Sequence, residues 1–213
     1  DSGSEHGGSP IVAPGSALAK VKPSGRDKYR IVGEIARGGM GVILKGHDAD
    51  LGRDVALKVL DPELAKNPAV VSRFVEEAQI GGQLQHPGIV PVYELGVMAD
   101  EAPYFTMKLV KGRTLSALLS QRRSTSENRT RLLQIFESVC QTIAYAHSKG
   151  VLHRDIKPAN IMVGAFGEVQ VVDWGLAKVL HRGGVADERR AKQSVFTIIE
   201  TVRSGPGCAR RMV

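Results

Sequence analysis

At positions 153–160 the chain reads His153-Arg154-Asp155-Ile156-Lys157-Pro158-Ala159-Asn160, and at 173–175 it reads Asp173-Trp174-Gly175. The first segment places a carboxylate, an ammonium group and a carboxamide within six residues, and the second adds another carboxylate. A phosphoryl-transfer site needs such groups: a carboxylate that orients the attacking hydroxyl, a cation for the γ-phosphate, and oxygen ligands for Mg²⁺. A lone His-Arg-Asp triplet is common, whereas the eight-residue form is much more specific.

Two further motifs lie upstream of this segment. Three glycines, Gly38, Gly39 and Gly41, follow a β-rich segment that begins at Tyr29, and glycine lets backbone N–H groups approach phosphate oxygens without a Cβ in the way. The segment from 54 to 60 then alternates as a central strand does, with Lys58 embedded among β-formers. With the segment at 153–160, these motifs resemble the eukaryotic-type (Hanks-type) serine/threonine protein kinases of bacteria.

The resemblance implies an α+β, two-lobed protein-kinase fold. It covers residues 29–180 and predicts a complete β-rich N-lobe with its hinge over residues 29–110. Residues 111–213 are then a mainly helical C-lobe, which we expect to be incomplete and to end in a disordered activation segment. Residues 1–28, rich in Gly, Ser, Pro and Ala, are predicted to be a disordered tail, since they cannot bury enough apolar surface to offset their ordering entropy.

The resemblance also implies a catalytic role for each residue of the motifs. Asp155 would orient the substrate hydroxyl and accept its proton, and Lys157 would meet the γ-phosphate. Asn160 and Asp173 would hold Mg²⁺, which prefers hard oxygen ligands.

In the family, the strand lysine binds the α- and β-phosphates of ATP and pairs with a glutamate of the following helix. Lys58 is that lysine here, and Glu76 and Glu77 are both candidates for the partner. The family's Arg-Phe-x-x-Glu-Ala pattern points to Glu77, which leaves Glu76 as an exposed surface residue.

The resemblance further implies a pocket for the nucleotide. The gatekeeper would be Met107, the backbone of Lys108 and Val110 would bond the adenine, and Met162 would close the pocket from below, although core filling explains Met162 equally well. Ala36 departs from the family pattern, which has glycine there, and Ile43 stands in place of a valine. The residues expected to contact the nucleotide, besides Lys58, are Ile35, Ala36, Gly38, Gly39, Gly41, Ile43, Ala56, Met107, Lys108, Val110 and Met162.

Two other positions carry expectations from the family. Trp174 stands where phenylalanine is usual, and Gly81 lies one helical turn after Glu77, where the family places a side chain against that ring. We therefore predict that the larger indole fills the volume left by Gly81. Arg154 implies control by a phosphate on the activation loop, for which Ser194, Thr197, Thr201 and Ser204 are available with nothing to choose among them.

Two helices are predicted with named ends and faces. Asn67-Pro68 supplies an N-cap and a proline at the first helical position, followed by an apolar face that contains Val71, Phe74, Val75 and Ala78. A longer helix is expected from Arg131 to Ser148, with Gly150 as its stop. Its apolar face would hold Leu132, Phe136, Val139, Cys140 and Ile143, which places Cys140 in the core.

Composition limits the class of protein. The chain is 42% apolar and 24% charged, which is ordinary globular usage, and it shows neither a membrane-spanning run nor a signal peptide. Two cysteines form no disulfide framework, so we expect a cytoplasmic location. The net charge of +7 comes without a nucleic-acid reading motif, which predicts solvated surface rather than a nucleic-acid partner.

Two functions remain open from the sequence. The first is transfer of the γ-phosphate of ATP, with Mg²⁺, to serine or threonine hydroxyls of protein substrates, impaired if the C-lobe is incomplete. The second is a nucleotide-binding module or scaffold without transfer. An incomplete C-lobe would also leave the apolar face of the long helix open to self-association.

Overall fold

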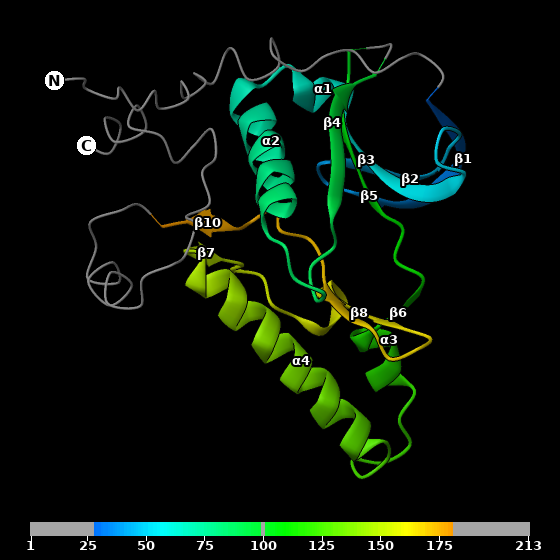
Figure 1. Ribbon diagram of the computed structural model, residues 1–213, viewed down its shortest axis with the longest axis vertical. Helices are drawn as coiled ribbons and strands as arrows, with labels where there is room; N and C mark the ends of the chain where they lie inside the picture. Colours follow the sequence, from blue (N-terminus) through cyan, green and yellow to red (C-terminus); the bar gives the residue numbers. More distant parts are fainter. Residues whose placement is uncertain (1–27, 99–100, 181–213) are drawn as a thin grey trace, which may run out of the picture.

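The computed structural model describes residues 28–98 and 101–180 of the 213-residue chain. An upper part built on a curved sheet stands above a lower part dominated by one long helix (Figure 1). In chain order the elements are β1 (Tyr29–Gly38), β2 (Gly41–Asp48), β3 (Arg53–Leu60), α1 (Pro62–Ala65), α2 (Pro68–Gln83), β4 (Val92–Val97), β5 (Pro103–Lys108), β6 (Gly112–Thr114), α3 (Leu115–Ser120), α4 (Arg129–Ser148), β7 (Val151–Leu152), a 3₁₀ turn (Pro158–Asn160), β8 (Ile161–Gly164), β9 (Val169–Val171) and β10 (Lys178–Val179). The β-rich upper part and the helical lower part confirm the expected two-lobed α+β class; the exact division at residue 110 stays a prediction.

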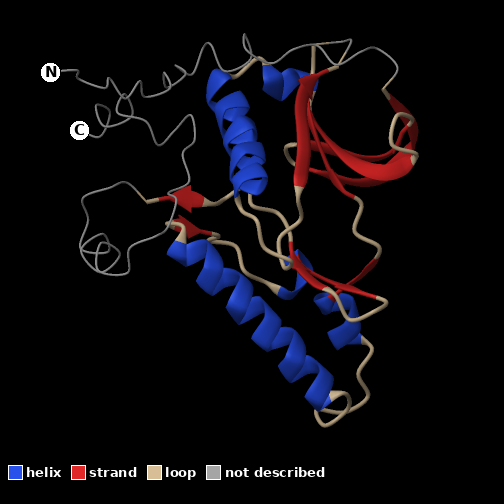
Figure 2. Cartoon of the chain, viewed as in Figure 1, coloured by secondary structure: helices blue, strands red, loops and turns tan. Residues whose placement is uncertain are grey.

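The upper sheet, drawn in red in the upper part of Figure 2, has five antiparallel strands in the order β1-β2-β3-β5-β4. Strand β3 lies at its centre, and Val55, Leu57 and Leu60 are completely or almost completely buried. The strand predicted from 54 to 60 is therefore confirmed, with Arg53 added at its start. Register places Lys58 between Ile43 of β2 and Phe105 of β5.

A cluster of charges lies on β2 and β3. The Asp54 carboxylate accepts on one oxygen from Lys45, with Nζ at 2.9 Å, and its other oxygen lies 3.0 Å from Nδ1 of His47. The hydrogen bond with His47 has the largest effect on the pKa of Asp54 and the hydrogen bond from Lys45 the second largest. Together they lower this pKa to about 2. The carboxylate therefore stays ionised well below the pH at which an ordinary aspartate is protonated.

Acidification should weaken the upper part of the molecule through this cluster. The depressed pKa of Asp54 contributes stability that is complete above the ordinary aspartate pKa and is lost as pH falls toward about 2. Urea unfolding at stepped pH should show a steeper loss of stability in the wild type than in Asp54→Asn. Parallel stability curves for the two proteins would contradict this contribution.

Helix α2 packs along the sheet as its sequence predicts. The Asn67 side chain accepts from the N–H of Ala69, and Pro68 occupies the first turn. The predicted apolar face is buried, and the Phe74 ring lies 5.0 Å from that of Phe105 between ring centroids. Both rings are buried, so this contact fixes α2 against β5 in the interior of the sheet.

The α2–β4 connection, residues 84–91, crosses from the upper part to the lower part. Strand β4 begins at Val92, directly after Pro91, which has no N–H to give to a ladder. Ile89 forms an isolated parallel bridge with Val171, and the N–H of Val171 donates to the carbonyl of Gly88 at 2.8 Å.

Helix α4 shows a different buried face from the one predicted. It buries Ile135, Val139, Thr142 and Ala146, whereas Phe136 is 65% exposed and Cys140 is also exposed. The placement of Cys140 in the core is therefore wrong. The reason lies in the α2–β4 connection: a Cβ on Gly88 would lie only 1.9 Å from Oγ1 of Thr142, so this connection sits directly on α4 and fixes which side of the helix faces inward.

Leu133 and Phe136 are both more than half exposed on α4, and self-association through them stays a prediction. Among the described residues, no helix combines the length and the apolar character needed to cross a membrane. The predicted tail, the candidate phosphorylation sites from Ser194 to Ser204 and the end of the expected activation segment lie outside the described residues.

Candidate active site

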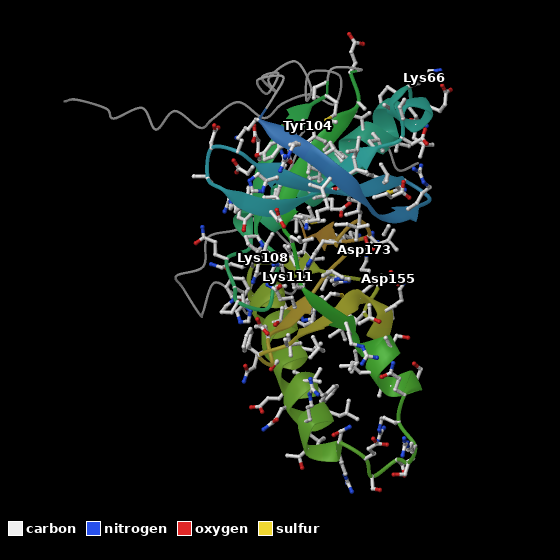
Figure 3. The ribbon with its side chains drawn as sticks, turned by 90° about the vertical axis from the view of Figure 1, so that its right-hand side faces the viewer. Lys66, Tyr104, Lys108, Lys111, Asp155 and Asp173 are labelled. Carbon is white, nitrogen blue, oxygen red and sulfur yellow. The ribbon has the colours of Figure 1, made fainter. Side chains whose placement is uncertain are left out.

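A cavity of about 380 Å³ lies between the upper sheet, α2 and the segments that follow β7 and β9. Figure 3 shows Asp155 and Asp173 next to each other just below the sheet. The lining of the cavity includes the expected site residues Ala36, Gly38, Gly39, Gly41, Ile43, Lys58, Glu77, Met107, Asp155 and Asp173. Residues from six separated segments of the chain therefore meet at one place.

The glycine-rich turn joins β1 to β2 over this cavity, with Gly38 paired to Gly41. Gly41 has a φ of 148°, and a Cβ there would lie 2.0 Å from the carbonyl oxygen of Val59, so only glycine fits. No atom lies within 4 Å of the Cβ positions of Gly38 and Gly39. The turn therefore leaves open space beside its backbone, as a phosphate cradle requires.

Lys58 and Glu77 form an ion pair at the wall of the cavity. Nζ of Lys58 donates to Oε1 at 2.6 Å and to Oε2 at 2.8 Å, and the Glu77 side chain is only 7% exposed. Burial raises the pKa of Glu77, and the attraction of Lys58 opposes that rise. The choice of Glu77 as the partner of Lys58 fits this geometry.

Glu76 is also buried, so the expectation of an exposed surface residue is wrong. The four consecutive residues from Val75 to Ala78 are all buried. This turn of α2 is therefore enclosed on every side, rather than presenting one face to solvent as an ordinary surface helix does.

The segment at 153–160 forms a compact polar cluster around Asp155. Its Oδ2 accepts from Nζ of Lys157 at 2.7 Å and from Nδ2 of Asn160 at 2.9 Å. The hydrogen bond from Lys157 lowers the pKa of Asp155, and the same bond raises the pKa of Lys157. Asp155 is therefore an ionised carboxylate at neutral pH.

His153 supports this cluster from beneath. Its Nδ1 accepts from the N–H of Asp155 at 3.2 Å, and its Nε2 lies 3.1 Å from the carbonyl oxygen of Val172. Burial lowers the pKa of His153, so the neutral ring, protonated on Nε2, satisfies both contacts. The histidine thereby ties the loop that carries Asp155 to the strand end that precedes Asp173.

Asp173 lies in the left-handed region, with a φ of 62°, and its side chain is 53% exposed. One carboxylate oxygen is 3.9 Å from Nζ of Lys58. A Cβ on Gly175 would come 3.0 Å from Oε2 of Glu77 and 3.4 Å from Oδ1 of Asp173. The turn thus brings the Asp173 carboxylate close to the Lys58–Glu77 pair, where a bulkier residue than glycine would crowd both acids.

The indole of Trp174 does not fill the space left by Gly81, so that prediction is wrong. A Cβ on Gly81 would meet only Val92 within 4 Å, with Cγ2 at 2.7 Å. The Trp174 ring lies instead 4.5 Å from that of His153, and its Nε1 donates to the carbonyl of Val171 at 3.2 Å. Helix α2 approaches β4 too closely for the indole to enter between them.

Several expected nucleotide contacts lie outside the lining of this cavity. Ile35 is 48% exposed on β1, where the pairing with β2 shifts register between Glu34 and Ala36. Ala56 is buried opposite Met107 in the sheet, and Met162 pairs with Gln170 in the lower sheet.

The remaining expected contacts lie at the connection between β5 and β6. The N–H of Lys108 donates to the carbonyl of Pro91 at 3.1 Å. Val110 follows in the short connection to β6. Figure 3 shows Lys108 and Lys111 close to each other on this connection. Arg154, expected to meet a phosphate, has a φ of 67° and donates from Nε to the carbonyl of Leu176 at 2.7 Å.

The cavity also has lining residues that sequence reasoning did not assign to the nucleotide. They are mostly apolar: Arg37, Met40, Gly81, Val90, Val92, Phe105, Val172, Trp174, Gly175 and Leu176. In a sequence, apolar residues in strands and at strand ends look like ordinary core residues. Only the lining residues next to Asp173, such as Trp174 and Gly175, could have been assigned to the cavity, because they adjoin a motif residue.

Comparison with known proteins agrees with this geometry. Residues 29–198 match the protein kinase domain family. The chain is 40% identical over 168 residues to the serine/threonine-protein kinase PknD of Protochlamydia amoebophila, covering 74% of this chain and 17% of that protein. It is 43% identical over 171 residues to PknD of Chlamydia muridarum, covering 76% of this chain and 18% of the relative.

The chain thus spans less than a fifth of the length of these relatives. Within that span, the order of motifs, the two-lobed architecture and the shared cavity agree with the family match. The chain belongs to the protein kinase domain family, and its resemblance to the bacterial serine/threonine kinases is confirmed.

Proposed function

We propose that this chain transfers the γ-phosphate of ATP, with Mg²⁺, to serine or threonine hydroxyls of proteins. The observation that carries the proposal is the meeting, around one cavity, of the Lys58–Glu77 pair, the Asp173 carboxylate and the polar cluster of Asp155. Phosphoryl transfer depends on positioning and charge stabilisation more than on covalent chemistry, and this arrangement supplies both.

The cavity suits a nucleoside triphosphate. Its volume of about 380 Å³ lies within the usual range of roughly 300–1,000 Å³ for small-molecule sites. The walls near Met107 and Ile43 are apolar, as a base requires, and the open backbone at Gly38 and Gly39 faces no other group within 4 Å of their Cβ positions. Lys58, held by Glu77, would contact the phosphates.

The donor set suits Mg²⁺. The Nδ2 of Asn160 is used by Asp155, which leaves its amide oxygen for a cation, and the half-exposed Asp173 supplies a carboxylate. Within the described residues, no group of three or more histidine, cysteine or acidic side chains could hold a metal alone. Mg²⁺ bound mainly through substrate phosphates and one carboxylate is the usual arrangement, and the ion would offset the charge that develops on the phosphates.

Asp155 is the group proposed to hold the substrate hydroxyl. Its pKa is lowered by Lys157, so it is ionised and able to accept a hydrogen bond from an alcohol at neutral pH. Lys157 donates a hydrogen bond to Oδ2 of Asp155, and its ammonium group would lie beside the transferring phosphoryl group. The two residues together would align the nucleophile and shield the negative charge that approaches it.

The experiment that tests the proposal measures labelled phosphate transfer from ATP to a serine- and threonine-containing test protein. Nucleotide binding is followed in parallel by the fluorescence of Trp174, the single tryptophan of the chain, which lines the cavity. We expect transfer that is abolished by chelation of Mg²⁺ and strongly reduced in Asp173→Asn. Asp50→Asn, an exposed turn residue, is the matched control.

Each outcome separates the two candidate functions. Transfer that depends on Mg²⁺ and on Asp173 supports the kinase. Saturable fluorescence change with Mg·ATP but no transfer would favour a nucleotide-binding module without transfer. Absence of both responses would contradict any nucleotide site in this cavity.

A further inference from the structure

Arg53 and Tyr93 stack on each other although their strands are not neighbours. Strand β5 lies between β3, which carries Arg53, and β4, which carries Tyr93. The guanidinium carbon of Arg53 is nevertheless only 3.9 Å from the centroid of the Tyr93 ring, well within cation–π distance. Two strands with another strand between them are about 10 Å apart, so this contact has to pass over the intervening strand.

The contact passes over at the point where β5 ends. Val55 pairs with Lys108, the last residue of β5 (Figure 3), and Arg53 precedes Val55 by two residues. Continued by two residues, this antiparallel register places Arg53 opposite Val110, in the connection to β6. Tyr93 lies on the other side, next to the β4 residue that pairs with the residue before Lys108. The stack therefore bridges the start of the connection that is expected to bond the adenine.

The register of β4 shows why the Tyr93 ring can meet Arg53. Val92 and Glu94 pair with consecutive residues of β5, so Tyr93 is an extra residue that no residue of β5 opposes. A β-bulge of this kind bends its strand and redirects a side chain. The ring is 40% exposed, so the sheet core does not need it, and its contact with Arg53 accounts for its direction.

Arg53 is also held from β2. Its Nε lies 3.6 Å from Oδ2 of Asp48, a carboxylate that is 1% exposed and that accepts the N–H of Leu51 at 3.3 Å through Oδ1. Among the described residues, no group accepts a hydrogen bond from this Nε. The ion pair with Asp48 and the stack on Tyr93 are thus the contacts that orient the guanidinium.

The stack lies on the face of the sheet away from the cavity. Side chains two residues apart on a strand share a face, so Arg53 shares the face of Val55 and Leu57, which pack in a cluster with Tyr104. Lys58 lines the cavity from the opposite face. Arg53 therefore does not contact a nucleotide in this cavity, and it acts on one only through the connection that it covers.

We propose that Arg53 and Tyr93 are positioning residues, whose stack fixes the connection between β5 and β6 from behind. The stack thereby holds the backbone of Lys108 and Val110 in place for adenine. The N–H of Lys108 donates to the carbonyl of Pro91, which leaves its own carbonyl for the base. No backbone hydrogen bond among the described residues uses the N–H of Val110. The inference rests on the proposed function and adds a determinant of its nucleotide affinity.

The test measures the binding of adenosine and of Mg·ADP to the full chain by equilibrium dialysis. Arg53→Met keeps a straight stem without the cation, and Tyr93→Leu removes the ring. Each should weaken both ligands by the same factor, about three- to tenfold, of the order of a partly desolvated cation–π contact. Tyr93→Phe keeps the ring and should bind both ligands as the wild type does. Arg30→Met, at an exposed arginine of β1, is the matched control and should also bind normally.

The two ligands separate the adenine end of the site from the phosphate end. Adenosine has no phosphates, so Lys58→Met should weaken Mg·ADP and leave adenosine unchanged, in contrast to Arg53→Met. The double variant Arg53→Met/Tyr93→Leu should lose no more than the larger single loss, because the two residues make one contact. Weakening of Mg·ADP alone in Arg53→Met, or losses that add in the double variant, would overturn the proposal.

Transfer kinetics supply a second readout of positioning. The KM for ATP should rise in Arg53→Met by about the factor found for Mg·ADP, with kcat unchanged, because the stack serves nucleotide binding and does not touch the reacting atoms. A loss confined to kcat would contradict this role.

Hydrogen exchange in the absence of nucleotide gives a readout that does not depend on the proposed function. The backbone N–H groups of residues 108–112 should exchange faster in Arg53→Met and Tyr93→Leu than in the wild type, while those of α4 keep their rates. If the wild type shows no transfer above an Asp155→Asn background, the proposed function fails, and the exchange pattern then decides the positioning role alone. Unchanged exchange at 108–112, or equal acceleration in α4, would refute it.

Discussion

Asp155→Asn is expected to lower the rate of phosphate transfer by about 10²- to 10⁴-fold, the usual contribution of a general base. The carboxylate is held by Lys157 and Asn160 at 2.7 and 2.9 Å, so the isosteric amide should keep the shape of the loop. It removes the negative charge that would attract the substrate hydroxyl. Transfer assays at saturating ATP would measure the loss in kcat.

The same variant should bind nucleotide almost normally. Lys58, Glu77 and the glycine-rich turn are untouched, so the Kd for Mg·ADP from Trp174 fluorescence should change little. A large loss of nucleotide affinity, or wild-type transfer in Asp155→Asn, would assign Asp155 a structural rather than a catalytic role. Asp50→Asn again provides a control for the loss of one surface charge.

Phe74→Ala is expected to cause the largest loss of stability, about 3–5 kcal/mol. The side chain is 0% exposed, belongs to the upper core with Leu60, and packs on the ring of Phe105 at 5.0 Å. Removal of the ring leaves a cavity between α2 and the sheet that neither element can close without moving the other. Thermal and urea unfolding of the purified chain would measure the change.

Phe166→Ala is the matched control for this loss. Phe166 is 95% exposed in the turn between β8 and β9, so its truncation should change the free energy of unfolding by no more than about 0.5 kcal/mol. Similar losses at both positions would contradict the assignment of Phe74 to the core. Phe74→Ala should also reduce transfer, because α2 carries Glu77.

The site was more predictable from the sequence than the packing around it. Asp155, Lys58 and Asp173 occur in spaced motifs whose polar side chains are unusual among apolar strands, and the structure brings all three to one cavity. The fold class followed from the same motifs. Only the family pattern could select Glu77 rather than Glu76 as the partner of Lys58. Helical periodicity does not distinguish two adjacent residues, and both glutamates are in fact buried.

The errors concern contacts between elements. The apolar stripe of α4 predicts that Cys140 and Phe136 face inward, but the rotation of the helix is set by Gly88 against Thr142, a contact between segments more than 50 residues apart. Trp174 was paired with Gly81 on the family's pattern, and Val92 takes that place. Periodicity reports which face of a helix is apolar, and only the partner decides which face is covered.

The contact between Gly88 and Thr142 has a mechanical consequence. The connection after α2 is held by the lower part, through α4 and through the bond from Val171 to Gly88, while Lys58 belongs to the upper sheet. The ion pair between Lys58 and Glu77 therefore joins the upper sheet to a helix whose C-terminal connection is anchored on the lower part.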